Sequence, residues 1–447
     1  MIDYQMFNDR LQITLDKRRD EGSLLIPPSP AKESLVDFGS NDTLSLSSSR
    51  LLSKEYLEEL ARNPDFTIAG KGGRLGGGPT QYQAELEEMI AQVHGAECAT
   101  YFNSGYDANV AIWSSLPQKG DVVIHDVRSH ASTWDGLRLG RASARIPFTH
   151  NSCESFRECV KSALNRFPDI AAGKSIIFFA VESFYSMDGD VVPIHRLILS
   201  AEELLPRKNF VFVIDEAHSN GVIGPNGSGF ISFYGLDTEI AIRVHTFGKA
   251  PGVNGGMLSI SAKHTAQINI SIAVILSNKT VKLTILNLAR NMLFSVGPNF
   301  PVLAAIKASY NLITSEEGEK RREVLQRNIT YLYNHLENQP QWEAILRLEI
   351  LRVPILRGWE MRPFQTPIVT VYTQKGQSKP LSIELRGRGY SVQQGGHPFI
   401  PRGLEGIRIM VHAGNNENEI QGLVEGIMAW SDTRATAMAA APLSSKL

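Results

Sequence analysis

The sequence predicts an α/β protein with a mainly parallel sheet, followed by a smaller α+β domain. From residue 97 onward, short apolar runs alternate with helical stretches, which is typical of parallel strands with helices on both faces of their sheet. After residue 298 the pattern changes to a long helical stretch and separate strand-like runs. The chain has 447 residues, too many for one compact core. We therefore expect four parts: an N-terminal arm at 1–50, a large domain at 51–297, a small domain at 298–434 and a flexible tail at 435–447.

The expected elements follow in chain order. Residues 5–20 are charged and compatible with a helix, and three prolines, at 27, 28 and 30, separate them from an extended segment at 35–38. Seven apolar runs predict the strands of the large sheet: 98–102, 122–125, 144–148, 175–181, 210–215, 243–247 and 257–260. The remaining expectations are a buried helix at 268–288, a long helix at 301–336, and strands at 368–372 and 407–411.

Composition and charge exclude several classes of protein. Hydrophobic residues make up 43% of the chain and charged residues 20%, an ordinary globular balance. The net charge of −1 gives no overall field that would draw the chain to nucleic acid or to a membrane. The cysteines, at 98, 153 and 159, have no metal-ligand spacing, so we expect neither a disulfide framework nor a metal site.

The ends of the sequence bear on localisation. The first residues do not resemble a secretory signal. The last three, Ser445-Lys446-Leu447, match the address that the peroxisomal import receptor reads. We expect a peroxisomal protein, or a cytoplasmic one if that address is not used.

The run Asp215-Glu-Ala-His218 ends a predicted buried strand and allows three interpretations. A helicase would also need a G-x-x-x-x-G-K-[ST] phosphate loop, which the sequence lacks. A hydrolase nucleophile elbow would place its serine at the strand tip, whereas Ser219 lies four residues beyond it. The third interpretation places Asp215 under a pyridinium nitrogen, where a carboxylate keeps the ring protonated as an electron sink. His218 would then orient the phenolic oxygen of the ring.

A pyridoxal phosphate site also needs a lysine, and Lys249 follows the next predicted strand, three residues after Thr246. A lysine near a cationic ring in a dry pocket loses its proton more easily, so it can form the Schiff base. Ser104 and Gly105 stand between a strand and a helix, where the helix N-terminus offers a site for phosphate. His130 follows another strand and is expected to stack on the ring and assist proton transfer.

Two further segments carry weaker signals. Residues 70–78 are rich in glycine, but Leu75 stands where a dinucleotide fingerprint requires its third glycine. Close backbone approach to a ligand or to a partner subunit fits this segment better. Residues 182–190 follow a strand and add polar groups at the same edge of the sheet.

Together these motifs resemble the α-oxoamine synthases, fold-type I pyridoxal phosphate enzymes that condense an amino acid with an acyl-CoA and release CO2. The resemblance spans residues 35–415. It rests on these segments: Ser40-Asn41-Asp42, Gly73-Arg74-Leu75, Ser104-Gly105-Tyr106, His130-Ala131-Ser132, Asp135-Gly136, Ser186 to Asp190, Asp215 to His218 with Gly221, Thr246 to Lys249, and Arg408. Within the family, residues 130–142 are most similar to the branch that joins L-alanine to pimeloyl-CoA in biotin synthesis.

The resemblance implies a role for each matching residue and a homodimer with shared active sites. Lys249 would bind the cofactor and act as the base at the α-carbon, while Asp215, His130 and His218 would serve the ring. Ser186 would join His218 at the ring hydroxyl. The implied phosphate-binding residues are Ser104, Gly105, Tyr106 and Thr246. Asn41 would lie near the substrate, and Arg408 would bind the substrate carboxylate, which a planar guanidinium can do bidentately.

The sequence departs from the family pattern mainly around the substrate. Thr43 and Ser45 replace a tyrosine and a glycine, and Gln83 replaces a histidine. Val296 replaces a threonine or serine, with Ser295 beside it, and Gly406 replaces the first arginine of an R-x-R pair. Leu24-Leu25 stands where an arginine serves the substrate. Two alternatives therefore stay open. One is an α-oxoamine synthase of secondary metabolism that uses another acyl thioester with alanine, serine or glycine, and the other is an inactive partner subunit.

Overall fold

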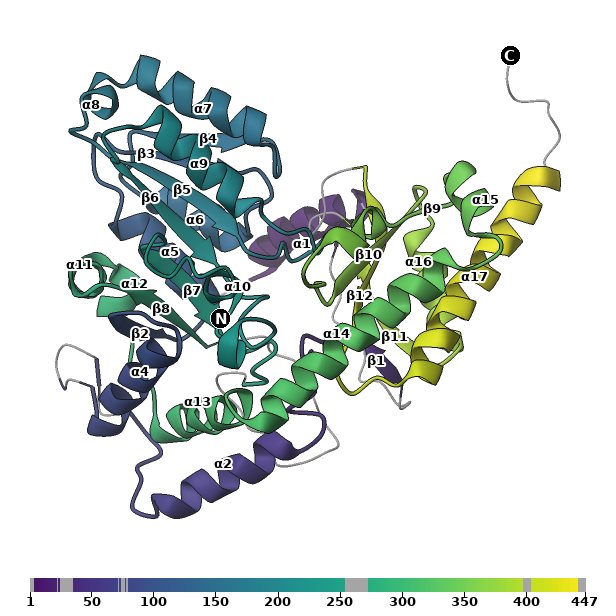
Figure 1. The fold of residues 1–447 in the computed structure, drawn as a ribbon, viewed down its shortest axis with the longest axis horizontal. Coiled ribbons are helices and arrows are strands. Elements are labelled where there is room, and N and C mark those ends of the chain that lie inside the picture. Colours follow the sequence, from purple (N-terminus) through teal and green to yellow (C-terminus); the bar gives the residue numbers. More distant parts are fainter. Residues whose placement is uncertain are drawn as a thin grey trace.

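The computed structural model describes residues 4–21, 23–24, 35–70, 72–73, 77, 79–253, 272–396 and 403–440. Of residues 439 and 440 it describes the backbone alone. The strand expected at 257–260, Arg74, Leu75, Leu25 and the tripeptide Ser445-Lys446-Leu447 lie outside these ranges. The expectations that rest on them stay predictions. Figure 1 shows two sheets, each covered by its own helices, with segments of the chain passing between them.

The larger sheet has seven strands in the order β2-β8-β7-β6-β5-β3-β4. Their bounds are β2 Cys98–Phe102, β3 Val122–Asp126, β4 Ala144–Phe148, β5 Ile177–Glu182, β6 Phe210–Asp215, β7 Ile242–Thr246 and β8 Ala273–Ser277. The five strands from β7 to β4 are parallel to one another, while β8 runs antiparallel to both of its neighbours. The predicted mainly parallel sheet is confirmed.

The expectation of one buried helix at 268–288 is wrong. Its described part contains the buried strand β8 and then helix α11, Lys279–Leu288. Asn278 separates the two, because its side chain accepts the Val281 N–H and begins the helix. Apolar runs of this length do not distinguish a buried strand from a buried helix.

Helices cover both faces of the large sheet. Neighbouring strand residues alternate between two core clusters, with Ile124 and Phe179 in one and Val123 and Phe178 in the other. The surrounding helices are α2 Leu51–Arg62, α4 Gln81–Val93, α5 Gly105–Ser115, α6 Ala131–Leu139, α7 Cys153–Arg166, α8 Pro168–Ala171, α9 Ile194–Leu204, α10 Phe230–Phe233, α12 Arg290–Leu293 and the 3-10 turn η1 Pro225–Gly227. This layered arrangement brings the carboxyl ends of the parallel strands together at one edge (Figure 1).

The second sheet has five strands in the order β1-β11-β12-β10-β9. The strands are β1 Val36–Phe38, β9 Leu351–Arg352, β10 Ile368–Thr373, β11 Tyr390–Gly395 and β12 Glu405–Met410. The helices and 3-10 turns around them are α14 Glu316–Glu337, α15 Trp342–Arg347, α16 Ser378–Gly387, α17 Glu417–Ala440, η2 Pro354–Leu356 and η3 Trp359–Met361. Strand β1, from the expected N-terminal arm, pairs in parallel with β11.

The helix expected at 301–336 is two helices, α13 Phe300–Ile313 and α14. The break falls at Ser315, whose side chain accepts the Gly318 N–H and begins α14. Near the N-terminus, the expected helix is present as α1, Gln5–Asp20, and none of its residues is buried. Within the described ranges, no helix is long and apolar enough to cross a bilayer.

Candidate functional site

The residues singled out from the sequence gather at the carboxyl edge of the large sheet. Strand β5 ends at Glu182, β6 at Asp215 and β7 at Thr246, and these three strands are neighbours. His130 follows β3, the next strand along, as the N-cap of α6. The fold thus joins groups that lie far apart in the sequence.

A chain of hydrogen bonds links Asp215 to His130. One Asp215 oxygen accepts the Ala217 N–H at 2.9 Å, and the other accepts the Asn109 side-chain amide at 2.8 Å. The same amide lies 3.1 Å from the Ser132 hydroxyl, which lies 2.7 Å from Nδ1 of His130. The carboxylate and the imidazole are therefore held in one network.

Glu182 is a second acid in this network, and its importance was not recognised from the sequence. Its buried carboxyl accepts the backbone N–H of His130 at 2.6 Å. Burial raises the pKa of Glu182 to about 8, and the nearby Asp215 carboxylate adds to the effect. Glu182 fixes the turn that carries the imidazole.

Lys249 lies within the field of these groups. Burial lowers the pKa of Lys249 to about 8, although the carboxylates of Asp215 and Glu182 oppose the shift. Burial lowers the pKa of His218 far below its usual value, with a further contribution from Lys249. Burial also lowers the pKa of His130, and the positive charge of Lys249 makes a second, smaller contribution. Near neutral pH the two imidazoles are uncharged, and the amine can lose its proton with little difficulty.

An anion cradle forms where Ser104, Gly105 and Thr246 meet. The Ser104 hydroxyl accepts the Asp107 N–H at 2.9 Å and so begins α5. Gly105 packs directly on Thr246, because a Cβ at Gly105 would lie only 2.4 Å from the Thr246 Cγ2. The free N–H groups of the first turn of a helix bind phosphate well. Tyr106 borders the cradle, with its hydroxyl bonded to Asp135 and its ring edge-on to His130.

Arg408 is buried with only neutral partners among the described residues. Its guanidinium donates to Gln393 Oε1 at 2.9 Å and to Asn41 Oδ1 at 3.4 and 3.5 Å, and Nε has no hydrogen-bond acceptor in the described part of the chain. Burial lowers the pKa of Arg408 to about 10, so it remains a cation. A buried cation without a carboxylate partner is well suited to bind a carboxylate ligand.

The residues present fit pyridoxal phosphate. The first turn of α5, where Gly105 packs on Thr246, suits the phosphate, and Asp215 offers a carboxylate for the ring nitrogen. Lys249 supplies the amine and Arg408 the positive charge for a substrate carboxylate. Ser186 follows β5 at this same edge of the sheet, and its expected role at the ring hydroxyl stays a prediction.

Several departures from the family pattern have a structural reason. Gly406 leaves no room for a side chain, because a Cβ there would lie 2.4 Å from the Val371 carbonyl oxygen. Ser45 adopts a left-handed conformation, with φ of 53°, and its hydroxyl accepts the Gly414 N–H at 2.9 Å. Thr43 is buried. Gln83 is buried as well and donates to Glu87 at 3.0 Å, which gives it a structural role.

The glycine-rich segment makes its close approach to this same chain. Gly73 forms a bridge with Val296, and a Cβ at Gly70 would lie 2.9 Å from the Gly297 carbonyl oxygen. Val296 is 57% exposed, and the Ser295 hydroxyl bonds to the Met292 carbonyl. The described part of the segment thus contacts residues 295–298 of the same chain, and the expected approach to a ligand or to a partner subunit stays a prediction.

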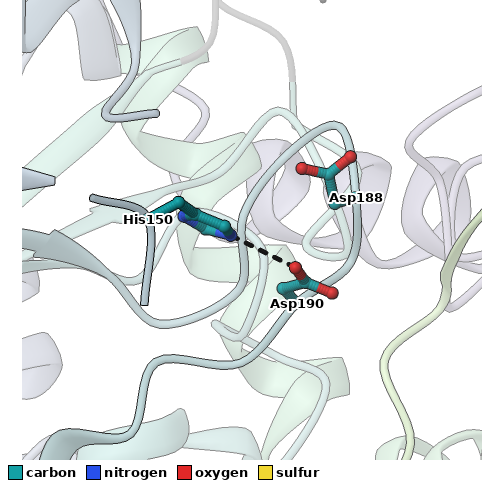
Figure 2. Close-up of side chains that lie close together, drawn as sticks. All are labelled: His150, Asp188 and Asp190. Atoms are coloured by element: carbon teal, nitrogen blue, oxygen red, sulfur yellow. Dashed lines mark hydrogen bonds and ion pairs between the residues drawn. The ribbon is translucent and has the colours of Figure 1, made fainter. Parts of the chain in front are cut away.

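A second group of polar residues lies beside the site. Figure 2 shows His150, Asp188 and Asp190, whose potential ligand atoms all lie within 4.8 Å of one another. Burial would lower the pKa of His150, but hydrogen bonds to Asp126 and Asp190 raise it to about 9. Asp188 is paired with Arg128. The group is therefore a set of ion pairs built on a protonated imidazole.

Comparisons with known proteins agree with this geometry. Residues 33–427 match the family model for class I and II aminotransferases. An aminoacyl transferase, sphA, of Aspergillus fumigatus is 35% identical over 95% of this chain and 87% of its own. An 8-amino-7-oxononanoate synthase of Emericella nidulans is also 35% identical, over 94% of this chain and 95% of its own.

Solved structures show the same fold. A serine palmitoyltransferase from Sphingomonas wittichii superposes with a TM-score of 0.72 at 20% identity, covering 98% of this chain and all of its own. The 8-amino-7-oxononanoate synthase of Francisella tularensis gives a TM-score of 0.63 at 24% identity, over 90% of this chain and 99% of its own. The expected fold-type I architecture is confirmed.

Proposed function

The chain belongs to the class I and II aminotransferase family, within its α-oxoamine synthases, and on that premise we propose that it joins L-alanine to pimeloyl-CoA. The products would be 8-amino-7-oxononanoate, CoA and CO2. The relatives support a pyridoxal phosphate-dependent acyltransferase. The observation that carries the proposal is the cluster of Lys249, Asp215 and buried Arg408, which matches a cofactor amine, a ring-nitrogen partner and a carboxylate clamp.

Each residue has a defined task in this reaction. When bound, pyridoxal phosphate supplies the electron sink that stabilises negative charge at the α-carbon of the amino acid. Asp215 would keep the proton on the ring nitrogen, and the uncharged imidazole of His130 would stack on the ring. Arg408 holds the amino-acid carboxylate, and Lys249 takes the proton from the α-carbon and later returns one. The cradle at Ser104, Gly105 and Thr246 holds the phosphate.

A second candidate is favoured by the acyl end of the site. Pimeloyl-CoA ends in a carboxylate, which calls for a cation, yet Leu24-Leu25 stands where the family pattern has an arginine that serves the substrate. The aminoacyl transferase sphA is as similar to this chain as the fungal 8-amino-7-oxononanoate synthase is. We therefore keep an α-oxoamine synthase of secondary metabolism, using an uncharged acyl thioester, as the alternative.

One experiment tests the proposal and separates the candidates. The purified protein, loaded with pyridoxal phosphate, is given alanine, glycine or serine with pimeloyl-CoA or palmitoyl-CoA, and CoA release is measured. Turnover of alanine with pimeloyl-CoA supports the main proposal, and turnover only with palmitoyl-CoA supports the alternative. Borohydride reduction followed by peptide mapping checks the shared premise. A reduced label on any residue other than Lys249, or no label at all, would refute both and favour an inactive partner subunit.

A further inference from the structure

Residues 186–190, here called the strap, join the two sheets. From the side of the small sheet, the Thr366 hydroxyl donates to the Gly189 carbonyl oxygen at 2.8 Å. The Thr370 hydroxyl donates to the Met187 carbonyl oxygen, and the Tyr372 hydroxyl donates to the Asp188 carboxylate. Strand β10 and the residues just before it therefore bind the strap at three successive positions.

Gly189 allows this contact to be close. It has φ of +73°, and a Cβ there would lie 2.1 Å from the Ile368 carbonyl oxygen. Any other residue would both strain the backbone and push β10 away. The contact between the strap and β10 thus depends on residues of both: Gly189 in the strap, and the hydrogen-bonding residues on and just before β10.

The other side of the strap is fastened to the turn that leads to His130. His150 lies 3.2 Å from Asp190 (Figure 2). The same imidazole lies 3.0 Å from Asp126, and Arg128 pairs with Asp188. Asp126 also accepts the Arg128 N–H at 2.8 Å. His130, two residues beyond Arg128, is held in the same turn.

The small-sheet side of the strap leads to Arg408. Thr370 lies directly opposite Arg408 in the antiparallel ladder between β10 and β12. Burial and the Asp188 carboxylate raise the pKa of Tyr372, so its phenol keeps the proton that it donates. The strand that carries the fastened residues is therefore the direct neighbour of the strand that carries the buried guanidinium.

We propose that Asp188 is a positioning residue that sets the carboxylate clamp, Arg408, against the ring-binding turn at His130. Asp188 links the two sides: it accepts the Tyr372 hydroxyl from β10, the strand paired with that of Arg408, and it pairs with Arg128 in the turn that leads to His130. This inference rests on the proposed function, because it concerns how the same site holds an amino acid. If the link only supported the fold, its removal would weaken the binding of all ligands alike. If the link positions Arg408, its removal should weaken mainly the binding of ligands that have a carboxylate.

The test uses Tyr372→Phe, which removes one hydroxyl and leaves the ring in place. The holoprotein is titrated with L-alanine, glycine and L-serine, and with ethylamine, an amine that has no carboxylate, while its visible absorption is followed. We expect Tyr372→Phe to weaken amino-acid binding about 3- to 10-fold and ethylamine binding less than about 2-fold. The effect is smaller than the roughly 10- to 150-fold value of one hydrogen bond to a charged group, because the lost bond acts on the clamp indirectly. Affinity for pyridoxal phosphate should change less than about 2-fold. Tyr331→Phe, a matched change on α14 outside the strap, should leave all these values unchanged.

A double-mutant cycle with Arg408→Lys supplies the decisive comparison. If the strap acts through the guanidinium, Tyr372→Phe should have less than about a 2-fold effect on amino-acid affinity in the Arg408→Lys background, because coupled residues are not additive. Additive effects, or equal losses for alanine and ethylamine, would overturn the inference while leaving the proposed function intact. A wild-type protein whose spectrum responds to no amino acid would instead refute the proposed function, and this inference with it.

Discussion

At the scale of single residues, Arg408 is a buried cation whose partners in the described part of the chain are neutral amides. Such a group costs free energy that a bound carboxylate can offset. We predict that Arg408→Ala weakens amino-acid binding about 30- to 5000-fold, the range measured for one partner of a buried charge pair. Spectral titration of the holoprotein with alanine measures the effect.

Arg408→Lys serves as the control for this prediction, because it keeps the charge and loses the bidentate geometry. It should fall between wild type and Arg408→Ala. Pyridoxal phosphate affinity should change less than about 3-fold in both variants, since the clamp assignment gives Arg408 no contact with the cofactor. Equal losses of cofactor and amino-acid affinity would show that the clamp assignment is wrong.

Lys249 gives a prediction about pH. Burial lowers the pKa of Lys249 to about 8, and only the uncharged amine attacks an aldehyde. The rate at which the apoprotein takes up pyridoxal phosphate should therefore rise with pH and level off above about 8. Stopped-flow absorbance would follow it.

Asp215→Asn tests the cause of that profile. The Asp215 carboxylate raises the pKa of Lys249 against the effect of burial, so its loss should move the plateau to lower pH. A profile that is unchanged in this variant would mean that the two side chains do not interact.

The main ring and substrate residues could be predicted because their chemistry is carried by residue type and by a place at a strand end. Asn109, Ser132 and Glu182 were missed as site residues. Asn109 reaches Asp215 across 106 positions, and nothing in the segment around Asn109 indicates that bond. Glu182 was recognised only as one polar residue among several, because its role depends on the backbone N–H of a distant turn.

At the scale of elements, the first turn of α5 and the end of β7 are packed without room for one methyl group. Gly105→Ala would drive its Cβ into the Thr246 Cγ2, and we predict a loss of pyridoxal phosphate affinity of about 10-fold or more, a typical cost of overpacking. Equilibrium dialysis of the apoprotein measures it.

Thr246→Ser is the matched second change, because it removes the methyl group that clashes and keeps the hydroxyl. In the double variant, most of the lost affinity should return. If Thr246→Ser gives no rescue, the contact between the two elements does not shape the cradle.

Most strands could be predicted because each is a short apolar run between turn residues. Strand β8 was hidden in a longer apolar stretch, where periodicity does not separate strand from helix. The break between α13 and α14 had a readable signal, because Ser315 is followed by two glutamates, a pattern typical of a helix start. The pairing of β1 with β11 joins residues more than 350 positions apart and leaves no local trace.

At the scale of the whole molecule, the ion pairs around His150 predict how stability depends on pH. Hydrogen bonds to Asp126 and Asp190 raise the pKa of His150 to about 9, above the value near 6.5 in the unfolded chain. The stabilisation is therefore complete below pH 6.5 and is lost as pH rises through about 9. It amounts to roughly 2–3 kcal/mol.

The free energy of unfolding of wild type and of His150→Gln, measured in urea at pH 6.5 and 9.5, checks this prediction. The wild type should lose roughly 2–3 kcal/mol more than the variant between the two pH values. The groups that face His150 are Asp126, Asp188, Asp190, Arg128 and the Tyr185 ring, and they are the same in both proteins. Equal losses of unfolding free energy in the wild type and in His150→Gln would contradict the assignment of a protonated imidazole.

The contacts of residues 186–190 also bear on protein engineering. Hydrogen bonds from Thr366, Thr370 and Tyr372 tie the small sheet to a loop that precedes it by nearly two hundred positions. A chimera that exchanged only the C-terminal part with that of a homologue would break these contacts, even if the crossover lay in an exposed connection. Recombination should therefore transfer both stretches together, because the residues of each are matched to those of the other.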